Sequence, residues 1–345
     1  MTTDEPNDRA ESRAPLAGGD VLVPVHDFAF PNGWSNPALS SLCARRYCEL
    51  LERGKILYFE SIPYDFPQQD RQFLLSQRQS DSPLHKNISY RPRQDVLRGA
   101  SGPGLDVEQL RQVMRRYSAE VTRFLAKLLE PYAAQWSLDY ASYRPEEEQG
   151  RNLPVHKRND LLHVDSFPTR PMHGNRILRC FTNINPNRPR IWNTTSDGFP
   201  ALAEAFAAQA GLARIAAQGS RLANPLVRNL KKIFGFKAVG HSAYDRFMLA
   251  FHDFLKEKTD FQQGCPKIRL QFPPGSTWIC FTDSVPHAVL SGQYALEQTF
   301  IIALPSLLLP GQAPIRVLER MAGKPLIKQG TRPRAVLDAP GNRNS

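Results

Sequence analysis

A short stretch at residues 161–167 constrains the fold of this chain more than any other feature. Its sequence, LLHVDSF, alternates apolar side chains with His163 and Asp165. Successive side chains of a β-strand point to opposite faces of a sheet, so an extended conformation would direct these two polar side chains to the same side. The pattern therefore predicts a strand that carries an imidazole and a carboxylate together on one face.

These two side chains form part of a known metal-binding arrangement. Two histidines and one carboxylate bind one face of Fe(II) and leave the remaining positions open for O₂ and a co-substrate. His287 is the candidate for the third ligand, because it follows a strand and turn at residues 275–283 and begins another apolar strand. The alternative is a hydrogen-bonded Asp–His pair in an ordinary strand, since a lone His-x-Asp tripeptide is a weak motif.

Strand-like segments surround this candidate triad in the second half of the chain. They alternate or are continuously apolar, and turn residues separate them, at residues 176–185, 190–194, 267–272, 278–281, 287–290 and 299–303. Residues 106–128 predict a long helix whose apolar stripe packs on a sheet. We therefore expect a mainly β fold with flanking helices, a double-stranded β-helix of the jelly-roll, cupin-like type.

The expected domain organisation follows from composition along the chain. Residues 1–19 lack hydrophobic periodicity and are expected to form a disordered tail, residues 20–322 a single domain, and residues 323–345 a basic flexible tail. No apolar run reaches the ~20 residues of a spanning helix. The five cysteines include no C-x-x-C pair and indicate a reducing compartment, so a cytoplasmic location is expected.

The charge of the chain limits the kind of partner that it binds. Lysine and arginine number 44 against 33 aspartate and glutamate, which gives a formal net charge of +11. Such a chain attracts nucleic acid, membrane surfaces and phosphorylated or carboxylated molecules. A basic amphipathic pattern at residues 224–234 predicts a helix that could lie on an anionic membrane surface, with a surface helix on the protein core as the alternative.

Several basic residues are candidates for binding anions. Arg179 and Arg190 lie on strands near the candidate iron ligands, where a guanidinium could pair with a carboxylate through two parallel hydrogen bonds. A structural salt bridge is the alternative for each of them. Residues 63–103 are interpreted as a long polar loop. On it, Arg91 and Arg93 are candidates for binding an anionic substrate, with a solvated surface as the alternative.

Three further histidines are considered as binding residues. His156 is a third candidate for substrate binding. His241 and His252 are assigned to a helix cap and to the surface, and neither is expected to bind metal.

The sequence blocks at residues 163–165, 179–183, 190–193 and 283–289 together resemble the Fe(II)/2-oxoglutarate-dependent oxygenases. They are most similar to the bacterial hydroxylases of 3-deoxy-D-manno-oct-2-ulosonic acid (Kdo). The resemblance implies Fe²⁺ held by His163, Asp165 and His287. It also implies that 2-oxoglutarate and O₂ are consumed while succinate, CO₂ and a hydroxylated sugar are formed.

One position departs from the pattern of this superfamily. Many members carry a basic residue about ten positions after the second histidine to bind 2-oxoglutarate. Here Gln298 stands at that point, and residues 288–309 contain no arginine or lysine. The resemblance therefore moves this role to other strands, to Arg179 and Arg190 with helpers Arg144, Asn183 and Trp192.

The function expected from this resemblance is hydroxylation of Kdo in the lipid A–Kdo inner core of lipopolysaccharide. The partner would be an anionic glycolipid, with peripheral contact at the cytoplasmic face of the inner membrane. The alternatives are the same chemistry on nucleic acid or protein, a non-catalytic jelly-roll module for anionic glycans, and a zinc-dependent isomerase or hydrolase. No interleaved basic and aromatic stretch favours nucleic acid, so none is expected as a partner.

Overall fold

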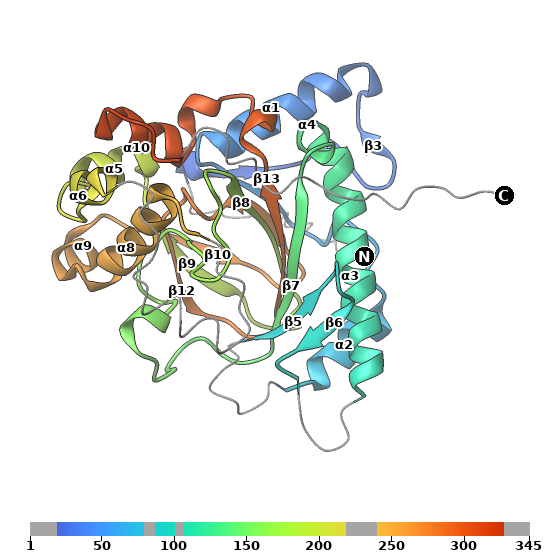
Figure 1. The fold of residues 1–345 in the computed structure, drawn as a ribbon. Coiled ribbons are helices and arrows are strands. Elements are labelled where there is room, and N and C mark those ends of the chain that lie inside the picture. The colour runs from blue at the N-terminus through green and yellow to red at the C-terminus, as the bar shows by residue number, and fades with distance from the viewer. Residues whose placement is uncertain (1–18, 79–86, 101–105, 219–239, 328–345) are drawn as a thin grey trace, which may run out of the picture.

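The computed structural model describes residues 19–78, 87–100, 106–218 and 240–327. Two β-sheets that face each other lie at its centre, and helices cover the outside (Figure 1). This is a mixed α/β fold, so the expectation of strands with flanking helices is confirmed at that level.

The larger sheet has eight strands. In spatial order they are β1 (Leu22–Pro24), β4 (Ile56–Phe59), β11 (Thr277–Phe281), β8 (Arg176–Asn183), β13 (Ala295–Ile302), β7 (Ser137–Arg144), β5 (Ile88–Arg91) and β6 (Val96–Arg98). Only β1 and β4 pair in parallel. In the centre, β8 and β13 pair along their whole length, from Ala295 opposite Asn183 to Ile302 opposite Arg176.

The smaller sheet has three antiparallel strands, in the order β10 (Ile268–Phe272), β9 (Arg190–Thr194) and β12 (His287–Ser291). A hydrophobic cluster joins it to the larger sheet, in which Trp278 of β11 stacks on Phe272 at a ring-centroid distance of 3.9 Å. Phe181 of β8 belongs to this cluster, so Arg179, two residues before it, faces the same interior. The sheets thus enclose both apolar and charged side chains.

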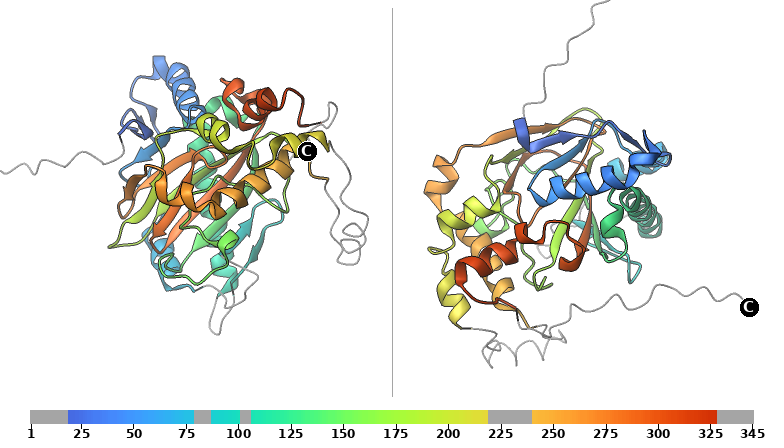
Figure 2. Two further views of the ribbon diagram at one scale, coloured as in Figure 1. Left: turned by 90° about the vertical axis from the view of Figure 1, so that its left-hand side faces the viewer. Right: turned by 90° about the horizontal axis from the view of Figure 1, so that it is seen from above.

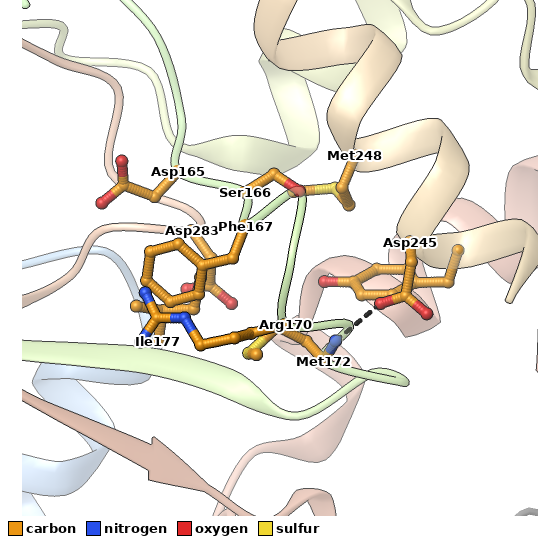
Figure 3. A pocket seen from close by; sticks show the side chains of 10 residues that line it. Asp165, Ser166, Phe167, Arg170, Met172, Ile177, Asp245, Met248 and Asp283 are labelled. Atoms are coloured by element: carbon orange, nitrogen blue, oxygen red, sulfur yellow. Dashed lines mark hydrogen bonds between the residues drawn. The ribbon is translucent and has the colours of Figure 1, made fainter. Parts of the chain in front are cut away.

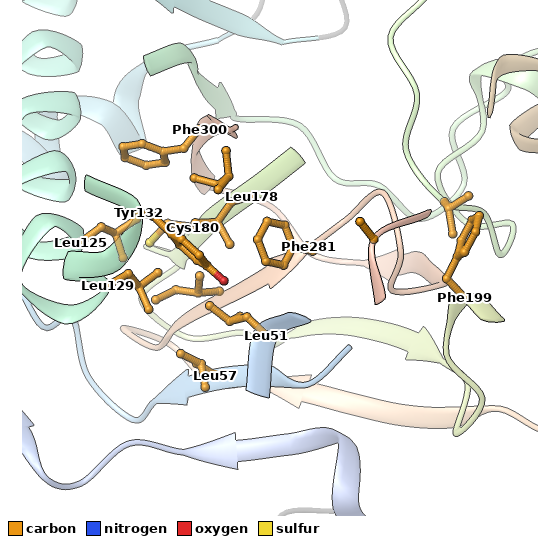
Figure 4. Packing of buried hydrophobic residues seen from close by; sticks show 14 of the residues in the cluster. Leu51, Leu57, Leu125, Leu129, Tyr132, Leu178, Cys180, Phe199, Phe281 and Phe300 are labelled. Carbon is orange, nitrogen blue, oxygen red and sulfur yellow. The ribbon is translucent and has the colours of Figure 1, made fainter. Parts of the chain in front are cut away.

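The opposite face of the larger sheet packs against helices. Along α3 (Val107–Leu128), the apolar side chains expected to form one stripe, from Leu110 to Leu128, are all buried. Leu125 and its neighbours contact Leu178, Cys180 and Phe300 of the sheet (Figure 4). This packing holds β8 and β13 in place from behind.

The remaining elements lie mostly around the edges. Alongside α1 (Ser40–Glu52) and α4 (Glu130–Ala133), α3 lies on one side of the molecule, and α5, α6, α8, α9 and α10 gather on the other (Figures 1 and 2). The remaining bounds are α5 (Phe199–Phe206), α6 (Leu212–Ala217), α8 (Ala243–Glu257), α9 (Thr259–Gly264), α10 (Pro314–Ala322), β2 (Phe28–Ala29) and β3 (Gly33–Trp34).

One expectation about the first half of the chain is wrong. Residues 63–103 contain α2 (Gln68–Ser76), β5 and β6, so they do not form one long loop. The apolar alternation of β5 consists of Ile88 and Tyr90 alone, which is too short to predict a strand. Pairing with β7, where buried Tyr90 lies opposite buried Ala141, stabilises the strand. Short strands of this kind depend on a partner far away in the sequence.

Some expectations lie outside the described residues. These are the amphipathic helix at residues 224–234 and most of the tails at 1–19 and 323–345. Within the part of the chain that the structure describes, every helix is too short or too polar to cross a bilayer.

Candidate metal centre

Backbone pairing brings the three predicted ligands together. The amide of His163 donates to the carbonyl of His287 (3.1 Å), and the amide of His287 donates back to His163 (2.9 Å). The amide of Asp165 donates to Thr282 (2.8 Å). His163 Nε2 lies 3.7 Å from Asp165 Oδ1, and His287 Nε2 lies 4.0 Å from Asp165 Oδ2. Two segments far apart in sequence thus form one compact cluster.

The imidazoles are oriented for metal binding. The Nδ1 atom of His163 lies 2.7 Å from the carbonyl oxygen of Leu161, and that of His287 lies 2.9 Å from Val285. A neutral imidazole that donates through Nδ1 keeps a lone pair on Nε2. Burial holds the pKa of His163 well below its ordinary value of 6.5 and also lowers the pKa of His287. Both rings therefore present Nε2 as a ligand at neutral pH.

The carboxylate of Asp165 completes the donor set. Burial tends to raise its pKa, but Arg179, the two histidines and a hydrogen bond from Thr282 together outweigh burial and hold the pKa below its ordinary value of 3.8. Its Oδ2 atom is buried and accepts no hydrogen bond. Two lone-pair nitrogens and a buried anionic oxygen that accepts no hydrogen bond lie within 4.8 Å of one another and fit a divalent cation such as Fe(II).

Two aromatic residues fix the histidine rings. Trp192 of β9 stacks on His287, with ring centroids 5.2 Å apart. His252 of α8 lies edge-on to His163 at 4.9 Å, and its Nδ1 lies 2.9 Å from the carbonyl oxygen of Val164. The assignment of His252 to the surface is therefore wrong. The sequence pattern of its helix did not indicate this contact, because the contact depends on how α8 packs beside residues 161–165.

A chain of opposite charges runs away from Asp165. Arg179 NH1 lies 3.2 Å from Asp165 and 3.6 Å from Glu297 of β13, and Arg144 NH2 donates to Glu297 (2.8 Å). Glu148 then lies 3.5 Å from Arg144 and 3.4 Å from Arg190. Sequence reasoning missed both glutamates, since neither has a motif that distinguishes it from a surface acid.

Three predicted co-substrate residues carry unpartnered donors. The Nε atoms of Arg179 and Arg190 and the Nε1 atom of Trp192 are buried and have no hydrogen-bond partner among the described residues. An unsatisfied buried donor is costly, so donors gathered at one site fit a bound anion that would accept from them. The residues present thus fit a dicarboxylate such as 2-oxoglutarate.

The other two co-substrate candidates differ from each other. Arg144 belongs to the charged chain beside Arg179. The side-chain amide of Asn183 instead donates to Arg188 and Phe272, while its oxygen accepts from the amide of Asn185. Asn183 therefore holds the turn after β8, and its hydrogen-bonding groups are occupied.

The three substrate candidates are placed differently. Arg91 is partly buried on β5 and lies over the ring of Tyr140, with its Cζ atom 4.9 Å from the ring centroid. Arg93 is exposed. His156 is exposed and faces Glu257 and Asp253 of α8. Substrate binding by these residues stays a prediction.

A small cavity lies beside Asp165 (Figure 3). The ring of Phe167 covers the guanidinium of Arg170 there, and the amide of Met172 donates to Asp245 at the start of α8. The remaining lining residues are Ser166, Ile177, Tyr244, Met248 and Asp283. The sequence interpretation did not single out Phe167 or Arg170, although Figure 3 places them next to the metal ligand.

We expect the metal-free protein to lose stability as the pH falls below about 6.5, the ordinary pKa of histidine. There the unfolded chain binds protons that the buried, neutral His163 and His287 do not, so the free energy of unfolding decreases by at most about 1.4 kcal/mol per pH unit for each histidine. Thermal unfolding of metal-free wild type and His163→Gln across this range would measure the effect. The same slope in both proteins would contradict it.

Comparisons with known proteins give consistent results. Residues 36–325 match the model of the family described as 3-deoxy-D-manno-oct-2-ulosonic acid (Kdo) hydroxylase. A solved structure of the Kdo hydroxylase KdoO, a non-heme Fe(II) α-ketoglutarate-dependent dioxygenase in complex with α-ketoglutarate and Fe(III), is 32% identical. That match covers 89% of this chain and 97% of that chain, with a TM-score of 0.72.

Two further KdoO structures are similar to this chain. The complex with cobalt(II) is 31% identical over 91% of this chain and 99% of that chain, with a TM-score of 0.74. The complex with succinate and Fe(III) has the same identity and coverage, with a TM-score of 0.73. No curated protein sequence matches the chain.

Proposed function

Because this chain belongs to the Kdo hydroxylase family, we propose that it is an Fe(II)/2-oxoglutarate-dependent dioxygenase that hydroxylates Kdo. The observation that carries the proposal is the buried cluster of two Nε2 lone pairs and one carboxylate oxygen that accepts no hydrogen bond. The substrate would be Kdo attached to lipid A, an anionic glycolipid that suits a chain of net charge +11.

Within this function, the side chains have separate tasks. His163, Asp165 and His287 would hold Fe(II) on one face and leave the other positions open. Arg179 and Arg190 would bind the carboxylates of 2-oxoglutarate. Trp192 would donate from the smaller sheet, Arg144 would support Arg179 through Glu297, and Asn183 would act through the turn that it holds. The two facing sheets would form the double-stranded β-helix expected for such enzymes.

The proposed reaction consumes O₂ and 2-oxoglutarate together with Kdo. Fe(II) would support the reaction of O₂ with 2-oxoglutarate, which yields succinate and CO₂ while one oxygen atom is inserted into a C–H bond of Kdo. The protein's own part is to orient the two substrates and to keep the site dry. Trp192 and Phe181, packed in the interior beside His287, exclude water from that side.

An anaerobic titration followed by turnover would test this proposal. Fe(II) and 2-oxoglutarate should produce a weak visible metal-to-ligand charge-transfer band, and admission of O₂ with Kdo–lipid A should yield succinate and a product heavier by one oxygen atom. Heat-denatured protein is the matched blank. Absence of the band, or a band without any oxygenated Kdo product, would reject the iron-dependent Kdo hydroxylase.

A further inference from the structure

Five arginines gather around the interior of the larger sheet, and four of them have an acidic partner. Arg144 pairs with Glu297 and Glu148, and Arg190 pairs with Glu148. Arg179 pairs with Asp165 and Glu297, while Arg170 pairs with Asp139. The fifth, Arg91, has no acidic partner among the described residues, and its buried Nε atom has no hydrogen-bond partner there either.

Arg91 is nevertheless connected to the metal centre through a column of alternating cations and rings. Its guanidinium lies over Tyr140, which Arg170 covers from another direction at 4.2 Å. Arg170 also lies 4.0 Å from the ring centroid of Phe167, and Arg179 lies 5.4 Å from that same ring. These are cation–π distances, so the column has a fixed geometry from Asp165 outward to β5.

The charges of this interior indicate that Arg91 binds an anionic ligand. A partly buried guanidinium without a counter-ion is unfavourable unless a ligand supplies the negative charge. The two positive charges of Fe(II) and the two negative charges of 2-oxoglutarate would cancel, so the proposed cofactors leave Arg91 uncompensated. An anion of the bound substrate would supply this charge.

The position of Arg91 indicates which part of the substrate carries this anion. In the larger sheet β5 is separated from β8 by β7 and β13, which at about 4.8 Å per strand places the backbone of Arg91 roughly 14 Å from that of Arg179. Tyr140, Arg170 and Phe167 lie between the two guanidinium groups, so the two ends of the column would meet different parts of a bound glycolipid. We propose that Arg91 binds a carboxylate or phosphate that lies one or two sugar residues away from the reacting Kdo. This inference rests on the proposed function and assigns part of its substrate site.

Three substrates separate the sources of such an anion. They are lipid A with one Kdo, lipid A with two Kdo residues, and the two-Kdo form after removal of its lipid A phosphates. Steady-state kinetics on each would compare wild type with Arg91→Gln. The control is Arg53→Gln, which removes an exposed arginine just after α1, and Arg91→Lys keeps the charge without the planar guanidinium.

We expect Arg91→Gln to lower kcat/KM roughly ten- to a hundredfold, as for loss of a charge-assisted hydrogen bond, but only on substrates that carry the anion. A penalty on both two-Kdo substrates and none on the one-Kdo substrate assigns a carboxylate. A penalty on both phosphorylated substrates and none on the dephosphorylated one assigns a phosphate. The loss should appear mainly in KM, Arg91→Lys should recover part of it, and Arg53→Gln should match wild type.

Other patterns would overturn the inference. An equal penalty on all three substrates would mean that Arg91 binds a group common to them, such as the carboxylate of the reacting Kdo, or that its role is structural. No penalty on any substrate would mean that Arg91 binds no part of the substrate. If thermal unfolding shows that Arg91→Gln is not folded, the kinetics of Arg91→Lys are used instead. A wild-type kcat/KM of Arg91→Lys on every substrate would then count against the inference. Wild type that is inactive on all three substrates would reject the proposed function itself, and this inference with it.

Discussion

His163→Ala should abolish iron binding and lower turnover by at least roughly a thousandfold, because a metal ion contributes several kcal/mol of transition-state stabilisation that this variant cannot recruit. His163 holds one of the three donor atoms, and its replacement leaves Asp165 and His287 alone. The charge-transfer band of the Fe(II)–2-oxoglutarate protein and the rate of succinate formation would both measure the loss.

Two other histidines provide graded controls for this experiment. His26 is exposed, so His26→Ala should retain the band and the rate. His252→Phe keeps a ring against His163 but loses the contact with Val164, and metal affinity should then fall about 10- to 100-fold, as for other residues that orient metal ligands. A full band in His163→Ala would exclude this residue as a ligand.

The sequence predicted the parts of the metal centre that depend on local pattern. The expected strand at residues 161–167 is an isolated bridge between His163 and His287 in the structure, whereas His287 begins the strand β12 as the pattern predicted. Pairing between segments more than a hundred residues apart brings these side chains together, and the strand and turn at residues 275–283 indicated His287 as the third ligand.

The rest of the site depends on tertiary packing. Glu297 and Glu148 are buried only because Arg144, Arg179 and Arg190 surround them, and a single acid in a sequence carries no sign of such partners. His252 follows the ordinary spacing of an amphipathic helix, so nothing in its context indicated a contact with a metal ligand. Residues of this kind are found from the arrangement of strands and helices, and strand pattern alone does not reveal them.

Glu148→Gln is expected to lower the free energy of unfolding by about 3–5 kcal/mol, the cost of leaving a buried charge without its partner. Burial tends to raise the pKa of Glu148, but Arg190 and Arg144 hold it below its ordinary value of 4.5, so the side chain is ionised at neutral pH. Arg144 would keep Glu297 in the variant. Arg190 would lose its acidic partner, with Gly292 as its remaining contact.

Arg190 is the residue that makes this loss severe. Burial lowers its pKa to about 10 even in the presence of Glu148, which shows how unfavourable the site is for an unpaired cation. Exposed Glu108 on α3 offers a matched control, because Glu108→Gln breaks a surface pair with Arg111 and should change the stability by less than about 1 kcal/mol. Chemical denaturation of both variants would measure the difference.

A double variant separates the buried charge from other effects of the substitution. Replacing both members of a buried ion pair by neutral side chains is often nearly neutral, whereas removing one is strongly destabilising. Glu148→Gln combined with Arg190→Met should therefore be more stable than Glu148→Gln alone. If instead the two losses add, Glu148 and Arg190 are independent, and the chain of charges that leads from Asp165 would end at Glu148.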